Sequence, residues 1–545
     1  MSAGSFHITT GDLRDTVFTG TLSEPGHTSY SPRRVRIADF SALRETGTFV
    51  VVVSDLGRSH PFEVKAAIHE ELAEAALKAF FFQRASTALD TEQAGQWSRP
   101  AGHPDTAVLV HASAATATRP EGTVIRAPRG WYDAGDYNKY VVNSGITMGT
   151  LLSLFEDFPE YFASDDLGIP ESGNGLPDLL DEVLWNLRWL LAMQDPDDGG
   201  VYHKLTTASF EDLETKPDEA RGTRYVVRKS TPATLDFAAV TAQAARILRR
   251  FERELPALAD SCLIAAERAW RWAERHPAEA YDQNALNERF EPAINTGAYG
   301  DRDFGDERLW AAAELFATTG GVHYYSEAGG FVTERPPEVP SWGDVEMLGF
   351  YTLVRGGSSL AESAQRRLGD FQERVLALAD SLLAGMDANP YRVVMGTDVR
   401  DFVWGSSGVA ANQGINLVQA YRITRDRRYL EAALANLDFL LGRNATGFSF
   451  VTGHGERTPM HPHHRPSISD DVAPPVPGLL AGGPNRNSQR QDRCTSYESE
   501  VPDEVYTDDT CSYASNEIAI NWNAPLVYLA GALEALQFEA GFSPR

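Results

Sequence analysis

Two aspartates stand three residues apart in a segment rich in aromatic side chains. Only Ala134 and Gly135 separate Asp133 from Asp136, and four aromatic residues and a lysine accompany them within 130–140. A carboxylate pair can hold and deprotonate one water molecule, and small residues let the backbone turn tightly between the acids. Aromatic rings beside acids suit a sugar, whose C–H faces are apolar and whose hydroxyl groups need acceptors. An Asp-Gly turn that binds calcium, or one at a solvated edge, is the alternative interpretation.

A single glutamate, Glu517, stands in the first turn of the last apolar helix that the sequence predicts, over residues 516–536. Acids favour helix N-termini, so Glu517 could be a capping residue. Alternatively, its apolar neighbours raise its pKa, so that it keeps a proton and acts as an acid. Just upstream, Asp508 and Asp509 could hold further substrate hydroxyl groups.

Four histidines cluster in one long loop, at positions 454, 461, 463 and 464, with Arg465 directly after them. Such clusters suggest a metal, but no carboxylate stands at the HExxH spacing and no cysteine partners them. Three roles stay open: zinc binding, donation to sugar hydroxyl groups, which we favour, and structural pinning of the loop.

Four acids also fall within seven positions before a predicted helix, namely Asp301, Asp303, Asp306 and Glu307. They could ligate a hard cation through oxygen, although they do not fit the EF-hand template. Capping of the helix N-terminus is at least as good an explanation.

The elements that must position these residues are mostly helices. Apolar residues recur at helical spacing in about ten segments, and almost no strand is predicted among them, which indicates a large all-α domain. The clearest of these segments are 176–193, 234–251, 257–274, 306–318, 365–386, 413–423, 428–441 and 516–536. The long loops 120–143 and 442–516 interrupt the pattern, and long structureless loops inside a compact domain are usually functional.

The first part of the chain differs from the rest. Segments 35–40, 48–53 and 62–65 alternate with Gly and Ser turns, which is typical of a small β-sandwich. The stretch is short for a sandwich, so we expect an incomplete one over residues 1–67. From Ile68 onward, apolar residues recur at helical spacing. We therefore expect the second domain to cover residues 68–545.

Composition limits the class of protein. A chain of 545 residues with 42% hydrophobic and 23% charged residues is typical of a soluble enzyme of at least two domains. The net charge, 49 − 76 = −27, makes nucleic acids and anionic membranes unlikely partners. Three cysteines cannot build a disulfide scaffold. No signal peptide is visible, which predicts a cytoplasmic protein, or a secreted one whose leader has been removed. The oligomeric state is not predicted.

Three motifs together resemble glycoside hydrolase family nine, the inverting β-1,4-glucanases, in the subgroup with an immunoglobulin-like domain before the catalytic barrel. Residues 131–137 resemble the family's DAGD loop, and residues 449–453 through 462–465 resemble its histidine signature. Residues 506–524 match its carboxylate signature at every fixed position. Smaller matches lie at 199–204, 306–312 and 482–485, and the likeness runs from about residue 35 to residue 536.

The resemblance implies a mainly α fold, an (α/α)6 barrel preceded by a small all-β sandwich. It implies that Asp136 is the catalytic base, that Asp133 positions the attacking water and that Glu517 is the acid. In an inverting enzyme the base and the acid should stand about 6.5–9.5 Å apart, to leave room for that water. Carried over from the matching motifs, the residues expected to bind sugar are Trp131, Tyr132, His203, His463, Arg465, Asp508 and Tyr513.

No cofactor is implied for the chemistry, but the family often binds a structural calcium near the positions of Asp306 and Glu307. A further acid comes from a Trp-Asp-Asp turn, which here reads Ser-Trp-Gly-Asp, so that only Asp344 of the two acids is present. Some relatives carry zinc on cysteines and histidines, which we do not expect, because Cys262 lies far from the histidine loop. Cys494 and Cys511 share the long loop and could pair under oxidising conditions.

The sequence thus predicts an endoglucanase-like hydrolase of cellulose-type glucans. An exo-acting cellodextrinase or β-glucosidase, or an exo-β-glucosaminidase acting on imported oligosaccharides, is the alternative within the same class. Outside that class the alternatives are a non-catalytic glycan-binding protein and a metalloenzyme built on the histidine loop. The first would be expected to have lost an acid, and the chain keeps all three.

Overall fold

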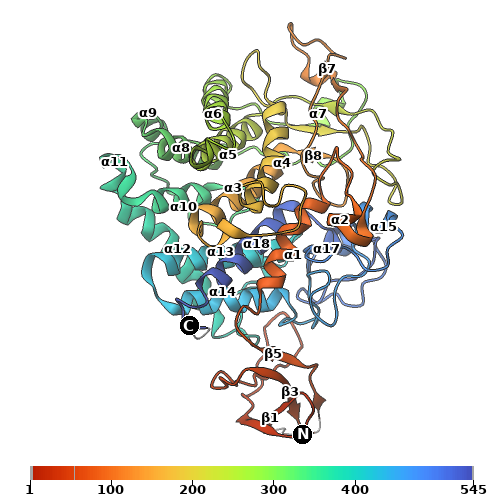
Figure 1. The fold of residues 1–545 in the computed structure, drawn as a ribbon, viewed down its shortest axis with the longest axis vertical. Helices are drawn as coiled ribbons and strands as arrows, with labels where there is room; N and C mark the ends of the chain where they lie inside the picture. Colours follow the sequence, from red (N-terminus) through yellow and green to blue (C-terminus); the bar gives the residue numbers. More distant parts are fainter. Residues whose placement is uncertain (1–3, 55, 543–545) are drawn as a thin grey trace.

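The computed structural model describes residues 4–54 and 56–542. The outer bounds expected for the two domains, residues 1 and 545, lie outside that range. A small sheet stands at one end of a larger helical body (Figure 1). The boundary expected between residues 67 and 68 falls between the last strand of this sheet and the first helix, and we retain it as a proposal.

The amino-terminal sheet has five strands in the order β2-β1-β3-β4, with β5 also pairing with β3. Phe6, Ile8 and Phe49 are its buried centre. The expected strands at 48–53 and 62–65 are β3 and β5, whereas 35–40 forms only an isolated bridge between Gly26 and Val35. The strands are β1 Ser5–Thr10, β2 Thr16–Thr21, β3 Gly47–Val53, β4 Gly57–Arg58 and β5 Phe62–Val64.

The helical body of the described chain is an α/α barrel. Neighbours in the inner ring pack directly on one another from α13 through α18, α3, α5 and α8 to α10. Asn416 of α13 donates to Tyr351 of α10 (3.2 Å), which links the two ends of that series. The inner helices are α3 Val141–Asp157, α5 Thr231–Leu248, α8 Gly305–Thr319, α10 Glu346–Gly356, α13 Ser406–Thr424 and α18 Ile520–Leu536; around them lie α1 Glu70–Phe82, α4 Asp178–Met193, α6 Leu258–Arg275, α9 Val322–Glu327, α12 Leu368–Met386 and α14 Arg427–Leu440.

The expectation of a mainly α barrel is confirmed, but individual helices differ from the prediction. Helices α3 and α10 were not predicted, and α13 begins before the predicted residue 413. Nearly every side chain of α3 and α13 is buried, including Gly, Ser, Thr and Asn residues. A helix that is buried on all sides has no polar face, so its sequence shows no apolar stripe at helical spacing.

The expectation of almost no strand in this domain is wrong. A second sheet has the order β7-β6-β10-β9-β8. Each strand has only two or three residues, too few for an alternating pattern to be visible in the sequence. The strands are β6 Val108–Val110, β7 Val124–Ile125, β8 Lys139–Tyr140, β9 Lys204–Thr206 and β10 Tyr225–Val226.

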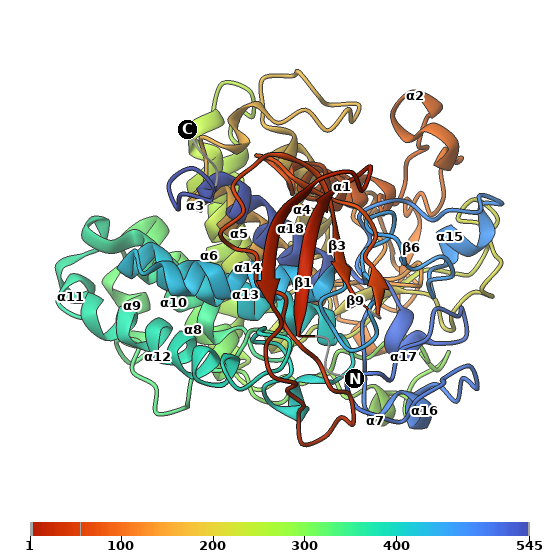
Figure 2. The ribbon, with the colours of Figure 1, turned by 90° about the horizontal axis from the view of Figure 1, so that it is seen from below.

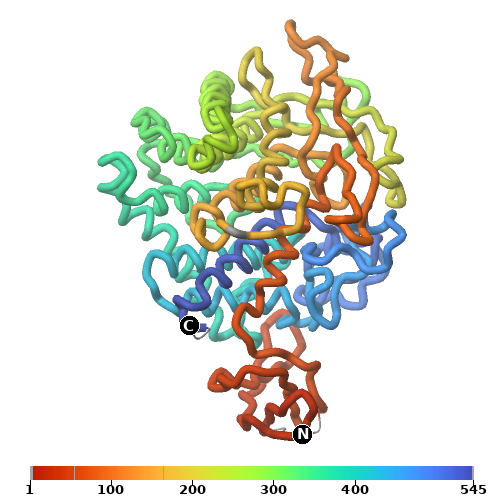
Figure 3. Tube along the Cα trace, viewed as in Figure 1, coloured from red at the N-terminus to blue at the C-terminus, as the bar shows by residue number. Residues whose placement is uncertain are grey.

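Long loops gather on the right of the view in Figure 3, whereas the left is almost entirely helical. The short helices are α2 Thr91–Ala94, α7 Gln283–Asn287, α11 Glu362–Gln365, α15 Arg465–Ser469, α16 Ser488–Gln491 and α17 Tyr513–Asn516. Seen from below, the amino-terminal sheet lies in front of the helical body (Figure 2). Within the described residues, none of the helices has the length and hydropathy needed to cross a bilayer.

Candidate active site

The long loops that connect the barrel helices enclose a cavity of about 880 Å³. Asp133, Asp136 and Glu517 all line it, so the two motifs that the sequence places far apart meet in one space. His463, Arg465 and Tyr513 line it as well. Aromatic residues make up much of the remaining wall, namely Tyr140, Phe210, Tyr299, Trp342, Trp404 and Trp522.

Gly135 lets the aspartate loop approach the histidine loop. A Cβ atom at Gly135 would overlap the carbonyl oxygen of His463 and would lie 3.2 Å from Oε1 of Glu517. Arg465 fixes the approach, because its Nη1 donates to the Gly135 carbonyl (2.6 Å). The small residue between the two aspartates is therefore required by close packing.

Asp136 is buried, and the hydrogen bonds that it accepts from described residues all reach Oδ2. The donors are the backbone N–H of Asn138 (3.3 Å), its Nδ2 (2.5 Å) and the hydroxyl of Tyr140 (3.0 Å). With one oxygen engaged in this way, Oδ1 is the oxygen that can receive a proton.

Asp133 is held at both oxygens. Nδ2 of Asn143 donates to Oδ1 (2.6 Å), and the hydroxyl of Tyr299 donates to Oδ2 (2.8 Å). Burial, reinforced by the charge of Asp136, raises the pKa of Asp133 well above its ordinary value.

Glu517 is not in the first turn of a long helix, as the sequence predicts. It follows the four-residue α17 with extended backbone (φ −71°, ψ 151°), and α18 begins only at Ile520. The segment pairs like a strand, since Glu517 forms a bridge with His463 and Ile518 forms one with Ala481. Neighbouring main chain, rather than a helix N-terminus, holds the carboxyl group in the cavity.

The environment of Glu517 favours its protonated form. Burial raises its pKa well above the ordinary value, and the charges of Asp136 and Asp133 raise it further. The predicted shift is thus confirmed in direction, although the apolar neighbours do not come from the first turn of a helix.

The predicted sugar-binding residues His463, Arg465 and Tyr513 lie together on the wall of the cavity. Nδ1 of His463 lies 2.6 Å from the carbonyl oxygen of Thr510, which can only accept, so the neutral ring carries its proton on Nδ1. Burial lowers the pKa of His463. The Tyr513 ring lies 5.7 Å from the His463 ring, centroid to centroid.

Four other predicted sugar-binding residues are engaged by protein behind the cavity. Nε1 of Trp131 donates to Glu182 (2.9 Å), and the hydroxyl of Tyr132 lies 2.9 Å from Nδ1 of His103. Both ring nitrogens of His203 have protein partners, Ser230 (2.8 Å) and the Ala298 carbonyl (2.8 Å). Asp508 accepts hydrogen bonds from the backbone N–H groups of Met460 (2.8 Å) and His461 (2.9 Å). Asp508 therefore supports the histidine loop.

Of the three roles considered for the histidine loop, structural pinning is the one that the described contacts show. His463 faces the cavity, whereas His464 is buried and its ring nitrogens contact Ser467 (2.9 Å) and Gln83 (3.1 Å), which pins the loop. Among the described residues, these histidines form no group with the spacing of metal ligands.

Several residues of the site were not identified from the sequence. Tyr140 and Tyr299 hold the two aspartates, and the indoles of Trp342, Trp404 and Trp522 line the cavity. Trp404, 42% exposed, stands just before α13, and no pattern in the sequence marks it as part of the site.

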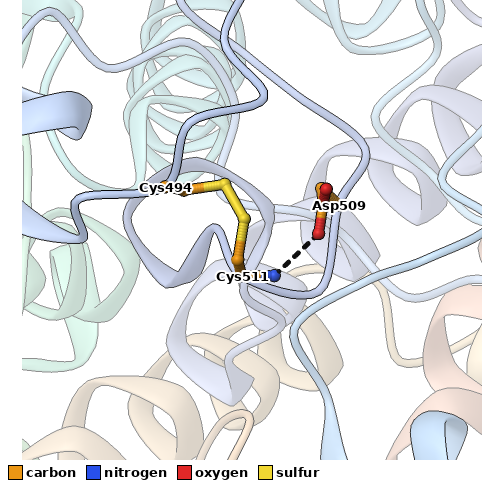
Figure 4. A group of neighbouring side chains, drawn as sticks. All are labelled: Cys494, Asp509 and Cys511. Carbon is orange, nitrogen blue, oxygen red and sulfur yellow. Dashed lines mark hydrogen bonds between the residues drawn. A yellow bond between two sulfur atoms is a disulfide. The ribbon is translucent and has the colours of Figure 1, made fainter.

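Cys494 and Cys511 form a disulfide, as considered from the sequence. Figure 4 shows the bridge beside Asp509, whose Oδ1 accepts the backbone N–H of Cys511 (3.0 Å). The three side chains lie within 4.8 Å of one another, but disulfide sulfurs are not thiolate ligands, so we assign no metal there. The bridge anchors the loop that reaches from Thr510 to Glu517.

The acids expected at a calcium site are only partly together. Asp344 is ion-paired with Arg335 (2.8 Å), and Asp306 accepts the backbone N–H of Val345 at one oxygen (2.8 Å). Asp306 and Glu307, together with Asp236 and Asp301, are among the residues with buried carboxylate oxygens that lack a hydrogen-bond partner in the described chain. Mutual repulsion contributes to the raised pKa of both Asp236 and Glu307, after burial.

Comparison with known proteins identifies the family of both domains. A model described as glycosyl hydrolase family 9 matches residues 69–530, and one described as a cellulase N-terminal ig-like domain matches residues 1–58. The chain is 45% identical over 524 residues to the xyloglucan-specific endo-beta-1,4-glucanase BoGH9A of Bacteroides ovatus, covering 95% of this chain and 88% of that protein.

A second relative and a solved structure agree on the family. Endoglucanase D of Acetivibrio thermocellus is 32% identical over 524 residues, covering 94% of this chain and 77% of that protein. The solved structure of Bacteroides ovatus GH9 superposes with a TM-score of 0.93 at 44% identity, covering 98% of this chain and 95% of that one.

Proposed function

The chain belongs to glycosyl hydrolase family 9, and we propose that it cleaves β-1,4-glucosidic bonds inside glucan chains with inversion of the anomeric carbon. The observation that carries this proposal is the presence of three carboxyl groups in one cavity, two from the aspartate loop and one from the segment before α18. Their environments differ in the way that an acid and a base require.

Glu517 is the general acid. Its raised pKa keeps the proton on the carboxyl group at pH values where an ordinary glutamate is ionised, so it can protonate the leaving glycosidic oxygen. The bridges of its segment to His463 and Ala481 keep the carboxyl group in place while the proton leaves.

Asp136 is the general base, and Asp133 orients the attacking water. The three donors on Oδ2 of Asp136 leave Oδ1 to take the proton of that water. Tyr299 and Asn143 hold Asp133 beside it. Water held by this pair would attack the anomeric carbon from the face opposite the leaving oxygen, which inverts its configuration.

The cavity wall suits a neutral glucan. Trp342, Trp404 and Trp522 offer indole faces to the C–H faces of glucose rings, while His463 and Arg465 contribute polar atoms for the hydroxyl groups. Asp508, Trp131, Tyr132 and His203 act on the sugar indirectly, through the loops that they support.

We also propose a structural calcium held by Asp236, Asp301, Asp306 and Glu307. Their carboxylate oxygens would have to draw together around the ion, since no three of these described side chains bring ligand atoms within 4.8 Å of one another. Six of their oxygens are buried without a hydrogen-bond partner among the described residues, and hard oxygen ligands of this kind suit Ca²⁺. Asp301 Oδ2 lies 3.7 Å from the position of a Cβ atom at Gly343, where the family carries an acid. When bound, the ion would neutralise these charges and tie α5 to α8; it takes no part in hydrolysis.

Product analysis tests the proposal. The enzyme is incubated with carboxymethylcellulose, xyloglucan, cellopentaose and a chitosan pentamer, and viscosity is followed together with the first sugars released. We expect a rapid fall in viscosity and a first product in the α-configuration by proton NMR. Monomer released from one end would indicate exo action, release from chitosan alone would indicate a glucosaminidase, and a β-configured first product would refute inversion.

A further inference from the structure

The second sheet, β7-β6-β10-β9-β8, which the sequence did not predict, gathers four polar residues next to Asp136. Asn138 immediately precedes β8, Thr207 immediately follows β9, Arg224 immediately precedes β10, and Asp105 lies shortly before β6. β9 runs antiparallel to β8 and β10, and β6 runs parallel to β10, so all four positions fall at the same end of the sheet.

These buried residues form a continuous hydrogen-bonded chain that ends on Asp136. Arg224 donates to both carboxylate oxygens of Asp105, from Nε (3.1 Å) and Nη2 (3.5 Å). Its Nη1 donates to Oδ1 of Asn138 (3.3 Å), which also accepts the backbone N–H of Thr207 (2.9 Å). Asn138 then donates from Nδ2 to Oδ2 of Asp136 (2.5 Å).

The donors around Asn138 fix the orientation of its amide group. Arg224 and Thr207 both present N–H groups to one end of the side chain. An amide nitrogen there would face these two donors and, among its described partners, only the hydroxyl oxygen of Thr207 (3.3 Å) could accept. The amide nitrogen of Asn138 must therefore point at Asp136. The backbone carbonyl of Asn138 also accepts the N–H of Asp133 (3.1 Å), so a single residue touches both aspartates.

We propose that Asn138 is a positioning residue for the base, and that Arg224, anchored on Asp105, holds it in the required orientation. The inference rests on the proposed role of Asp136 as the base. Asn138 acts through Asp136: it engages Oδ2 and so turns Oδ1 toward the water that loses its proton. The ends of the short strands hold the base, while the loops of the barrel enclose the cavity that it lines.

Kinetics of single variants provide the first test. We expect Asn138→Ala and Arg224→Met each to lower kcat about 10- to 100-fold on cellopentaose, with KM changed by less than about 2-fold, because a misplaced catalytic group slows the chemical step. Arg224→Lys, which keeps a donor and the charge, should recover part of the loss. The matched control is Arg228→Met, at the other end of β10, where the side chain pairs with Glu279 and full activity is expected.

A double variant tests whether Asn138 acts through the base. Asp136→Asn/Asn138→Ala should be no slower than Asp136→Asn alone, because without the base there is nothing left to position. Losses that multiply in the double variant would overturn the inference, as would full activity in Asn138→Ala. If Asp136→Asn itself is active, the proposed function fails instead. Thermal melting shows whether Asn138→Ala folds. If it does not fold, Arg224→Lys and Arg224→Met, each alone and combined with Asp136→Asn, test the inference in its place.

Discussion

The backbone N–H of Ile520 donates to the carbonyl oxygen of Asp133 at 2.9 Å, which joins the first residue of α18 to the aspartate loop. This main-chain bond links the segment of the acid to the segment of the base without using either catalytic side chain. The catalytic side chains can therefore be replaced while the backbone that carries them keeps its contacts.

Replacement of either catalytic carboxyl group should abolish most of the activity. Asp136→Asn and Glu517→Gln should each lower kcat at least ~100-fold on a soluble glucan, the usual size of a general acid–base contribution. Asp260→Asn and Glu274→Gln, on the exposed face of α6, are matched controls that should leave activity unchanged. Near-normal turnover in a folded Asp136→Asn or Glu517→Gln protein would refute the role assigned to that residue.

Asp133 should influence the pH at which Glu517 loses its proton and activity falls. Its charge contributes to the raised pKa of Glu517, and Glu517 must be protonated to act. In Asp133→Asn that contribution disappears, so the pKa of Glu517 falls and activity is lost at a lower pH on the alkaline side. The measurement is kcat/KM against pH, normalised to each enzyme's maximum. An alkaline limb that stays in place, or moves upward, would contradict this coupling.

The carboxyl group of Glu517 should lower the free energy of unfolding at neutral pH, compared with its value in acid. Its pKa in the folded protein is raised above the unfolded value of about 4.3, so its contribution to stability is fully present below pH 4. That contribution is lost as the pH rises toward the folded pKa, because only the unfolded chain gains from ionisation.

Glu517→Gln removes this penalty, so the variant and the unaltered protein should melt alike at pH 4. At pH 7–8 the variant should melt about a degree or more higher. Glu274→Gln serves as the control, with no pH-dependent difference. A variant that is less stable than the unaltered protein at pH 8 would show that the carboxylate is better accommodated than we infer.

Calcium should raise the melting temperature without changing turnover at moderate temperature. After treatment with EDTA, added CaCl₂ should raise Tm by several degrees, since binding to the native state alone stabilises it. Glu307→Gln should weaken this response, while Glu274→Gln should keep it. A Tm that is indifferent to both EDTA and calcium, in a protein of normal fold, would exclude the ion from this cluster.

The sequence identified the residues of the site better than the elements that carry them. Asp133, Asp136 and Glu517 were predicted from residue types and from a family likeness, and they share one cavity. The backbone around Glu517 was predicted wrongly, because an apolar run before α18 looks helical even where it pairs as an extended strand.

The buried polar residues that hold the aspartates were harder to predict from the sequence. Tyr299, which holds Asp133, lies 166 residues further along the chain, so its proximity depends on the whole barrel. Asn143 is only ten residues away from Asp133 but lies in α3, a helix that the sequence did not predict. Strands of two residues, such as β8 and β10, leave no periodic signal, although they align Asn138 and Arg224. Contacts of this kind are set by tertiary packing, which single-sequence patterns do not record.

The place of Glu517 in the chain has a consequence for biosynthesis. The aspartate loop leaves the ribosome early, whereas the acid follows far later, immediately before α18, the helix that packs between α1, α3 and α13. A nascent chain thus holds a water-binding pair long before it has a proton donor, and the barrel that encloses both is still unsealed. A chain that stops before Glu517 would lack the proposed acid and should be inactive, so activity requires that synthesis continue past this residue.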